Sequence, residues 1–317
     1  MRRNRFLIGL AAALVSLSCA AQTASSTLRL IVPFPAGGVT DLAARALAER
    51  LGPALGQTVI VENRPGGGSR IGTDAVMKAV PDGQTLLFTN TSYAILPIVD
   101  PAVKYEADKS LVPVGMLASY GLSLVVANAL PVKTLPELVA YARSHPGKLS
   151  YGSSGPGSGT HFLGEYFKSL TGTFIVHIPY RSTAGALNDV AGGTLDMAFD
   201  ATAKAYADAG KVRMLAVTGV QRDPRMPGVP TAVEAGLKDF VIVSWVGLLA
   251  PVGTPPATLA RLNAALNEAL AAPALRQRMQ EMGLTPEGGD AARMLRQIRE
   301  DVRLHRQIAE RARLRFD

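Results

Sequence analysis

The sequence predicts an α/β protein built from largely parallel sheets. Short apolar or β-branched runs alternate with longer amphipathic stretches, and glycine and proline separate them along the whole chain. This alternation is typical of repeated βαβ units. Two glycine-rich segments, about 120 residues apart, each follow an expected strand and open an expected helix. Ligands of open α/β sheets bind beyond the carboxyl ends of strands, so two such segments predict a cleft.

The elements follow from the local pattern. The apolar and β-branched runs predict strands at 28–32, 58–61, 85–88, 122–126, 174–176, 195–199 and 212–217. Apolar residues at helical spacing predict helices at 41–55, 135–144, 160–171, 184–191, 255–271 and 291–313. The segments near 124–130 and 240–247 end apolar strands, so we expect the chain to cross between two domains there.

The N-terminus reads as an export signal. A basic start at residues 1–5 precedes an uncharged apolar run from Phe6 to Leu17, and small residues follow it. The run is shorter than the ~18 to 20 residues that span a bilayer. We therefore expect a signal peptide over 1–21 and a periplasmic location. Lipid attachment at Cys19 is the disfavoured alternative because Ser16 stands where a leucine is expected, and the export route stays open.

Composition narrows the function. The net charge of +8 falls to +5 without the three arginines of the signal, and the arginines between 276 and 315 alternate with acids. We interpret them as a solvated helical face. Nucleic-acid binding is not expected because aromatic residues are few and scattered. Cys19 is the only cysteine, the four histidines have no metal-ligand spacing, and no nucleotide motif occurs, so we expect neither metal nor cofactor.

The first glycine-rich segment covers residues 35–41, Pro-Ala-Gly-Gly-Val-Thr-Asp. It reads as a strand that breaks into a loop and opens a helix, which is the backbone geometry that holds anions. Either Thr40 or Asp41 is suited to be the N-cap. The alternatives at this point are a plain helix cap and a ligand contact.

The second segment, residues 151–160, has three glycines and several hydroxyl groups after Tyr151 and Gly152. Its backbone N–H groups and the side chains of Ser153, Ser154, Ser158 and Thr160 are donors for a carboxylate, at roughly 1.5–3 kcal/mol for each charge-assisted bond. An amphipathic helix follows directly. This favours a binding loop over a flexible surface loop, and an exported protein with two such loops is expected to be a receptor for a small acid.

Two further positions have competing interpretations. Asp200 follows the expected strand 195–199, where it either caps the next turn or meets the cleft and holds a ligand amine or water. Ser158 and His161 suggest a nucleophile and base, but three residues across a helix start seldom align, and no third orienting group is visible. His161 is expected to donate into the cleft instead.

Eight sequence blocks keep their order along the mature chain, at residues 31–41 (IVPFPAGGVTD), 61–66 (VENRPG), 81–86 (PDGQTL), 146–149 (PGKL), 157–161 (GSGTH), 177–180 (HIPY), 227–231 (PGVPT) and 247–251 (GLLAP). In these blocks the chain resembles the Bug family, the solute receptors of tripartite tricarboxylate transporters.

This resemblance implies a type II periplasmic binding protein fold, with two α/β lobes, a two-crossover hinge and a ligand cleft. The lobes are expected at 22–126 plus 245–317 and at 127–244. The implied ligand-binding residues are Phe34, Gly38, Thr40, Asp41, Asn90, Ser92, Ser154, Ser158, Thr160, His161 and Asp200, with Asn63 and Tyr180 as weaker candidates. Two departures from many relatives, Val39 in place of glycine and Ala201 in place of asparagine, bear on ligand identity.

The expected function is capture of a small carboxylate for a membrane permease of the tripartite type, by a protein that is not an enzyme and is monomeric. A ligand-sensing receptor that docks on a signalling partner is one alternative. A secreted serine hydrolase using Ser158 and His161 is the other.

Overall fold

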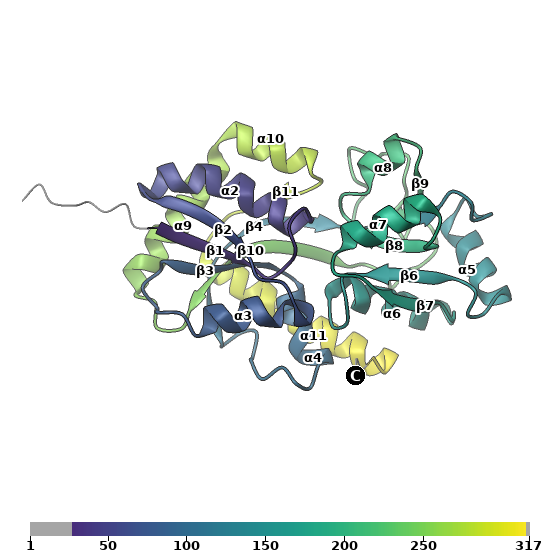
Figure 1. Ribbon diagram of the computed structural model, residues 1–317, viewed down its shortest axis with the longest axis horizontal. Coiled ribbons are helices and arrows are strands. Elements are labelled where there is room, and N and C mark those ends of the chain that lie inside the picture. Colours follow the sequence, from purple (N-terminus) through teal and green to yellow (C-terminus); the bar gives the residue numbers. More distant parts are fainter. Residues whose placement is uncertain (1–26, 315–317) are drawn as a thin grey trace, which may run out of the picture.

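Two separate β-sheets divide the structure, a computed structural model that describes residues 27–314 (Figure 1). The first sheet has the strand order β11-β4-β10-β3-β1-β2, and the second has the order β7-β6-β8-β5-β9. The strands of the first are β1 (Thr27–Val32), β2 (Thr58–Asn63), β3 (Thr85–Asn90), β4 (Leu111–Gly121), β10 (Val243–Pro251) and β11 (Thr285–Pro286). Those of the second are β5 (Ser123–Ala127), β6 (Ser150–Ser153), β7 (Val176–Pro179), β8 (Met197–Asp200) and β9 (Val212–Val217). The two-lobed α/β fold is confirmed.

Helices cover both faces of the first sheet. One face packs against α2 (Val39–Leu55), α9 (Pro256–Ala271) and α10 (Pro273–Glu281), and the other packs against α3 (Arg70–Met77), α4 (Ser92–Val99) and α11 (Ala291–Ala312), with the short 3₁₀ turn η2 (Gly67–Ser69) before α3. Side chains alternate across a strand. Leu30 therefore joins the first core, and its neighbour Ile31 joins the second.

The second sheet is covered in the same way. Its strands pack on one face against α5 (Leu135–Ser144) and α6 (Gly159–Thr171), and on the other against α7 (Thr183–Gly192) and α8 (Lys204–Asp208). Leu124 and Val126 of β5 face the first of these cores, and Val125 and Ala127 face the second. Each lobe is therefore a three-layer unit with a core on either side of its sheet.

The sheets are mixed, which corrects the expectation of largely parallel sheets. β1 lies parallel to β2 and β3, and β6 lies parallel to β7 and β8, but β10 and β5 run antiparallel to their neighbours. The reason is topological. The parallel strands of both lobes end at the space between the lobes, so a strand that enters its sheet from that space must run in the opposite direction.

Three segments link the lobes. The chain passes from β4 to β5 through Leu122 and returns from β9 to β10 through residues 218–242. The third link is α11, in yellow in Figure 1. Met294 and Ile298 near its start pack in a core of the first lobe, and Ile308 near its end packs in a core of the second. The sequence prediction had assigned residues 245–317 to the first lobe as one piece.

The expected signal peptide over 1–21, with Cys19, lies outside the described residues. Within residues 27–314, no helix has both the length and the apolar character needed to cross a bilayer.

Candidate functional site

A cavity of about 90 Å³ lies between the lobes. Its wall comes from the β1–α2 and β3–α4 loops of the first lobe, the β6–α6 and β7–α7 loops and the end of β8 in the second, and both crossover segments. The lining residues are Phe34, Pro35, Gly38, Val39, Thr40, Asn90, Thr91, Ser92, Ile95, Tyr120, Leu122, Ser154, Gly159, Thr160, Leu163, Ser182, Thr183, Asp200, Ala201, Ile242 and Ser244.

The N-termini of four helices meet at this cavity. The first residues or N-caps of α2, α4, α6 and α7 are among its lining residues, two helices from each lobe. A helix N-terminus carries unpaired N–H groups and a partial positive charge, so it stabilises an anion. No arginine, lysine or histidine belongs to the lining that the described residues form. Helix termini and hydroxyl groups are therefore what this site offers to a negative charge.

Asp41 holds the first glycine-rich loop from behind. Its side chain is 1% exposed and accepts hydrogen bonds from the Gly37 N–H group at 2.9 Å and from the Asn63 amide at 2.9 Å, and it pairs with Arg45. Burial alone would raise the pKa of Asp41, but these bonds outweigh burial and lower it. Asn63 also donates to the carbonyl of Phe34 at 3.0 Å. Both side chains shape the loop and do not line the cavity.

The glycine that this loop requires is Gly37, whose φ is +89°. Val39 is the first residue of α2, and its φ is not positive. The N-cap before it is Gly38, with φ −78°. The departure at Val39 therefore leaves the backbone unstrained.

On the same lobe, the Thr40 hydroxyl accepts a hydrogen bond from the Asn90 side-chain amide at 3.0 Å. The Asn90 Oδ1 atom accepts from the Ser92 N–H group at 2.9 Å. The hydroxyl of Ser92 in turn accepts from the N–H group of Gly159 in the second lobe at 3.1 Å. This chain of bonds joins the two lobes across the cavity.

The second glycine-rich loop is closed by its own hydroxyl groups. Ser158 is the N-cap of α6: its oxygen accepts from the His161 N–H group at 3.2 Å, and its hydroxyl donates to the Gly155 carbonyl at 2.7 Å. Thr160 accepts from the Ser154 N–H group at 3.0 Å. Ser154 and Thr160 line the cavity, whereas Ser158 is buried inside the loop.

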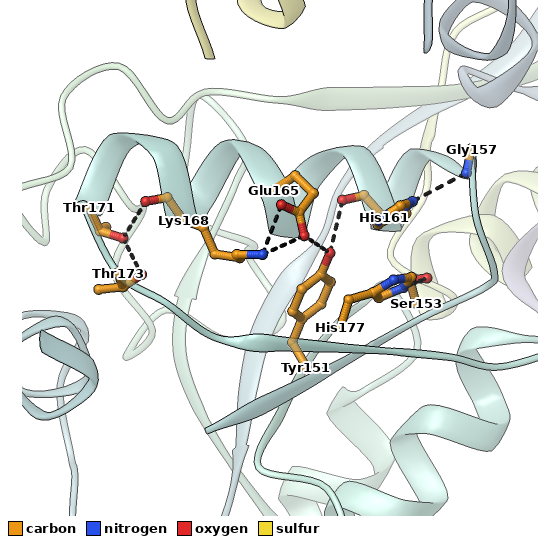
Figure 2. Close-up of polar contacts among 9 residues, drawn as sticks. All are labelled: Tyr151, Ser153, Gly157, His161, Glu165, Lys168, Thr171, Thr173 and His177. Carbon is orange, nitrogen blue, oxygen red and sulfur yellow. Dashed lines mark hydrogen bonds and ion pairs between the residues drawn. The ribbon is translucent and has the colours of Figure 1, made fainter. Parts of the chain in front are cut away.

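Behind this loop lies a buried polar network (Figure 2). The ring of His161 stacks on His177 with 3.9 Å between centroids, and its Nδ1 atom accepts from the Gly157 N–H group at 3.2 Å. His177 contacts the Ser153 hydroxyl at 2.7 Å. Burial, helped by the neighbouring His177, lowers the pKa of His161 to about 3. His161 fixes the backbone of the loop and does not line the cavity.

The network continues along α6. Tyr151 donates its hydroxyl proton to Glu165 at 2.7 Å, and Lys168 binds the same carboxylate at 2.8 Å. Burial and the adjacent Glu165 raise the pKa of Tyr151 far above its usual value. These bonds hold α6 against β6.

Asp200 is the acidic residue of the cavity wall. It is 2% exposed, and its Oδ1 atom accepts from the N–H group and the hydroxyl of Thr202 at 2.5 and 2.7 Å. Burial raises its pKa, against the hydrogen bonds from Thr202 and Thr183. Asp200 therefore caps the following turn and also faces the cavity. That it holds a ligand amine or water stays a prediction.

The contacts of Ser158 and His161 give the serine hydrolase alternative no support. Ser158 gives its proton to the Gly155 carbonyl, and the His161 Nδ1 atom accepts from the Gly157 N–H group. Among residues 27–314, no group of three or more histidine, cysteine or acidic side chains is placed to hold a metal ion.

Eight of the expected site residues line the cavity: Phe34, Gly38, Thr40, Asn90, Ser92, Ser154, Thr160 and Asp200. Asp41, Ser158 and His161 lie behind the loops, as does Asn63. Sequence analysis did not identify Ser182 and Thr183 at the α7 start, or Tyr120 and Ile242 near the crossovers, as residues of the cavity wall. The hydroxyl pair after Tyr180 was a usable signal for the first two, since it repeats the N-cap pattern of α6.

This fold and site define a two-lobed periplasmic solute receptor, and comparison with known proteins agrees. The model of the tripartite tricarboxylate transporter family receptors matches residues 43–314, so the chain belongs to that family. It is 37% identical to Protein BugT of Bordetella pertussis over 263 residues, which cover 82% of this chain and 81% of BugT. Members are binding proteins and not enzymes.

Solved structures extend the likeness. The periplasmic binding protein BugD is 32% identical with a TM-score of 0.87, covering 91% of this chain and 98% of BugD. R. palustris Rpa4515 with adipate is 32% identical with a TM-score of 0.86, over 93% and 99% of the two chains. MatC of Rhodopseudomonas palustris with bound malate is 31% identical with a TM-score of 0.85, over 89% and 98%.

Proposed function

We propose that this receptor captures a small organic acid, holds its carboxylate between the N-termini of α2 and α6, and delivers it to a membrane permease of the tripartite type. The observation that carries the proposal is the meeting of four helix N-termini, two from each lobe, at one cavity without a cationic side chain in its described lining.

The rest of the cavity suits the carbon skeleton of such an acid. Ile95, Leu163 and Ile242 form apolar wall, and the hydroxyl groups of Thr40, Ser154 and Thr160 stand at the two loops. The adipate and malate complexes of the two relatives support a carboxylate ligand here. The proposed ligand-binding site is completed by Phe34, Gly38, Asn90, Ser92 and Asp200.

The proposed partner is the permease, with a sensor protein as the alternative, and the receptor is proposed to act as a monomer. Uptake of the acid that requires both the permease and this receptor supports the permease as the partner. Uptake that is independent of the receptor opposes it. We also propose cleavage after residue 21, which N-terminal sequencing of the exported protein tests. The lobe boundaries at 126/127 and 244/245 stay a prediction.

A thermal-shift screen of small carboxylates against their matched amides tests the ligand class. A ligand at 100 times its dissociation constant adds ~2.7 kcal/mol to the free energy of unfolding, which for lobes of this size raises the midpoint by roughly 5–10 °C. We expect an acid to shift the midpoint and its amide to leave it unchanged. A shift by the amide alone contradicts the proposal. If no compound shifts it, the protein must release a bound acid on denaturing extraction, and a protein free of any acid contradicts the proposal.

A further inference from the structure

One face of α11 is a line of arginines. An α-helix has 3.6 residues per turn, so residues three or four positions apart lie on the same side. This spacing is followed by Arg296, Arg299, Arg303 and Arg306. All four are exposed, the first two with 64% and 60% of their side-chain surface. We call these four residues the arginine face.

The arginine face lies opposite the side that fixes α11 to the protein. The buried side carries Met294, Ile298, Asp301, His305 and Ile308. Asp301 accepts from the Trp245 indole at 2.6 Å and from Gln297 at 3.0 Å, and His305 packs edge-on against Phe162 with 5.0 Å between centroids. The helix is thus anchored in both lobes, and the arginine face is held as a rigid array.

Two exposed acids, Glu300 and Glu310, lie on the same side of α11 as the four arginines, which leaves this side with a net positive charge. Ion pairs with carboxylates neutralise only part of the arginine charge. Arg299 contacts Asp108 at 3.4 Å, and Arg296 reaches Asp290 only at 4.0 Å. No acidic side chain of the described residues lies within ion-pair distance of Arg303 or Arg306. All the cations after Lys238 are arginines. Arginine binds phosphate and carboxylate oxygens in a planar, bidentate manner that lysine does not reproduce.

The make-up of this face fits a layer of phosphate groups better than a protein surface. Protein interfaces have an apolar or aromatic centre that carries most of the binding energy. Leu304 is the only large apolar residue of the described part of α11 that is strongly exposed, at 42%, and it lies beside the arginine line. Charge without an apolar centre is sufficient for anionic headgroups, which attract basic residues near the membrane surface.

We propose that the arginine face docks the receptor on an anionic phospholipid surface. The receptors of this family are periplasmic, so a membrane lies within reach of the protein. Docking confines the receptor to the plane in which its membrane partner diffuses. The contact is independent of the ligand cavity, which is formed by other residues.

Vesicle binding tests this proposal. The probes are vesicles of phosphatidylglycerol mixed with phosphatidylcholine, and vesicles of phosphatidylcholine alone, with protein purified after export. Each arginine contributes about fivefold to the partition coefficient, which corresponds to about 1 kcal/mol per charge. We therefore expect the variant R296Q/R299Q/R303Q/R306Q to bind the anionic vesicles about a hundredfold or more weakly. High salt removes wild-type binding, and neutral vesicles bind neither protein.

A matched control removes four exposed cations from elsewhere, as R50Q/R261Q/R276Q/K211Q. It has the same net charge as the test variant and keeps binding within a few-fold of the wild type. If the fourfold test variant loses its fold, R303Q and R306Q alone, which break no ion pair, each reduce binding about fivefold.

Equal binding by the test variant and the control overturns the proposal, because net charge alone then explains it. Absence of wild-type binding to anionic vesicles at low salt overturns it as well. Retention on immobilised poly-L-glutamate that depends on the arginine face, without vesicle binding, assigns the face to an acidic protein instead. Carboxylate binding measured in parallel reports on the proposed function separately.

Discussion

The hydroxyl group of Thr160 organises the second glycine-rich loop from the cavity side. It accepts from the Ser154 N–H group at 3.0 Å and lines the cavity at the start of α6, where we propose that the carboxylate binds. Thr160→Val keeps the shape of the side chain and removes that oxygen. We expect the dissociation constant of the acid to rise about tenfold, since a hydrogen bond to a charged group is worth about 1.5–3 kcal/mol. Isothermal titration calorimetry measures it.

Thr173 provides the matched control. It is exposed to the same extent as Thr160, 8%, and its hydroxyl contacts Thr171 at 2.8 Å at the far end of α6 (Figure 2). We expect Thr173→Val, like Thr160→Val, to lower the free energy of unfolding by about 1 kcal/mol. Unlike Thr160→Val, it should leave the dissociation constant unchanged. Equal losses of affinity in both variants would place the effect on α6 as a whole and contradict a local role for Thr160.

His161 makes stability depend on pH. Its pKa is about 3 in the folded protein, because of burial and the neighbouring His177, and 6.5 in the reference state. The unfolded chain therefore binds the proton more readily, so the stabilising contribution is present above pH 6.5 and is lost as pH falls toward 3. Between pH 6.5 and 5 the free energy of unfolding should fall by about 2 kcal/mol from this group. Denaturant titrations at both pH values measure the change.

The titration of Asp301 and His305 does not mask the pH dependence of stability that His161 causes. Burial raises the pKa of Asp301 to about 6 and lowers that of His305 to about 4. Between these values the folded protein gains a proton at Asp301 and lacks one at His305, so their effects largely cancel. His161→Asn should flatten the pH dependence. An unchanged slope in His161→Asn would contradict this assignment.

At single positions, the sequence predicted the chemistry of the loops better than their orientation. Hydroxyl groups after glycines marked Thr40, Ser154 and Thr160, which line the cavity. The same pattern also selected Ser158 and His161, which turn inward to hold the loop. One-dimensional spacing does not distinguish the two sides of a loop, because φ values such as +73° at Gly157 set the side that each residue faces.

Among the elements, α4 and β10 show what sequence patterns omit. Six of the eight residues of α4 are buried and Pro97 lies within it, so no helical periodicity marks it. The antiparallel direction of β10 has no local signal, because it follows from the chain re-entering the first sheet from the other lobe. Amphipathic helices such as α2 and α11, with one exposed face, were predictable because their periodicity survives in the sequence.

The η2 turn of the first lobe contacts the β6–α6 loop of the second lobe. An added Cβ at Gly68 would lie 3.0 Å from Leu96 Cδ1 and 3.0 Å from the carbonyl oxygen of Pro156 in the second lobe. Gly68→Ala forces the lobes apart there, because a backbone carbonyl cannot move aside alone. We expect severalfold weaker acid binding, measured as the dissociation constant.

Gly56 is the control for Gly68. Both glycines have φ +63°, so alanine costs each a comparable backbone strain of about 1 kcal/mol. No atom of residues 27–314 lies within 4 Å of a Cβ built at Gly56. Gly56→Ala should thus share the loss of stability and keep full affinity. If Gly68→Ala also keeps full affinity, close contact between the η2 turn and the β6–α6 loop is not required for binding.

At the scale of the whole molecule, a further interlobe contact lies at a cavity of about 840 Å³ that the crossover segments help to line. Arg225, in the segment between β9 and β10, donates to the Glu281 carbonyl of the first lobe at 2.8 Å and pairs with Asp223. Gly283 leaves room for the guanidinium, which would lie 2.0 Å from a Cβ at that position. The C-terminus of α10 carries a partial negative charge that attracts this cation.

This contact joins the lobes in the conformation that encloses the ligand cavity. We predict that it is lost when the lobes separate, and it would then favour the enclosed state. Arg225→Ala removes one charge-assisted bond between lobes, and we expect acid binding to weaken about tenfold, chiefly through faster dissociation measured by stopped-flow fluorescence. Arg222→Ala is the control, since its partners Glu234 and Pro227 both belong to its own segment. Its dissociation rate should match the wild type. Equal rates for all three proteins would show that the lobes close without the Arg225 contact, leaving closure to α11, the crossover strands and the Ser92–Gly159 bond.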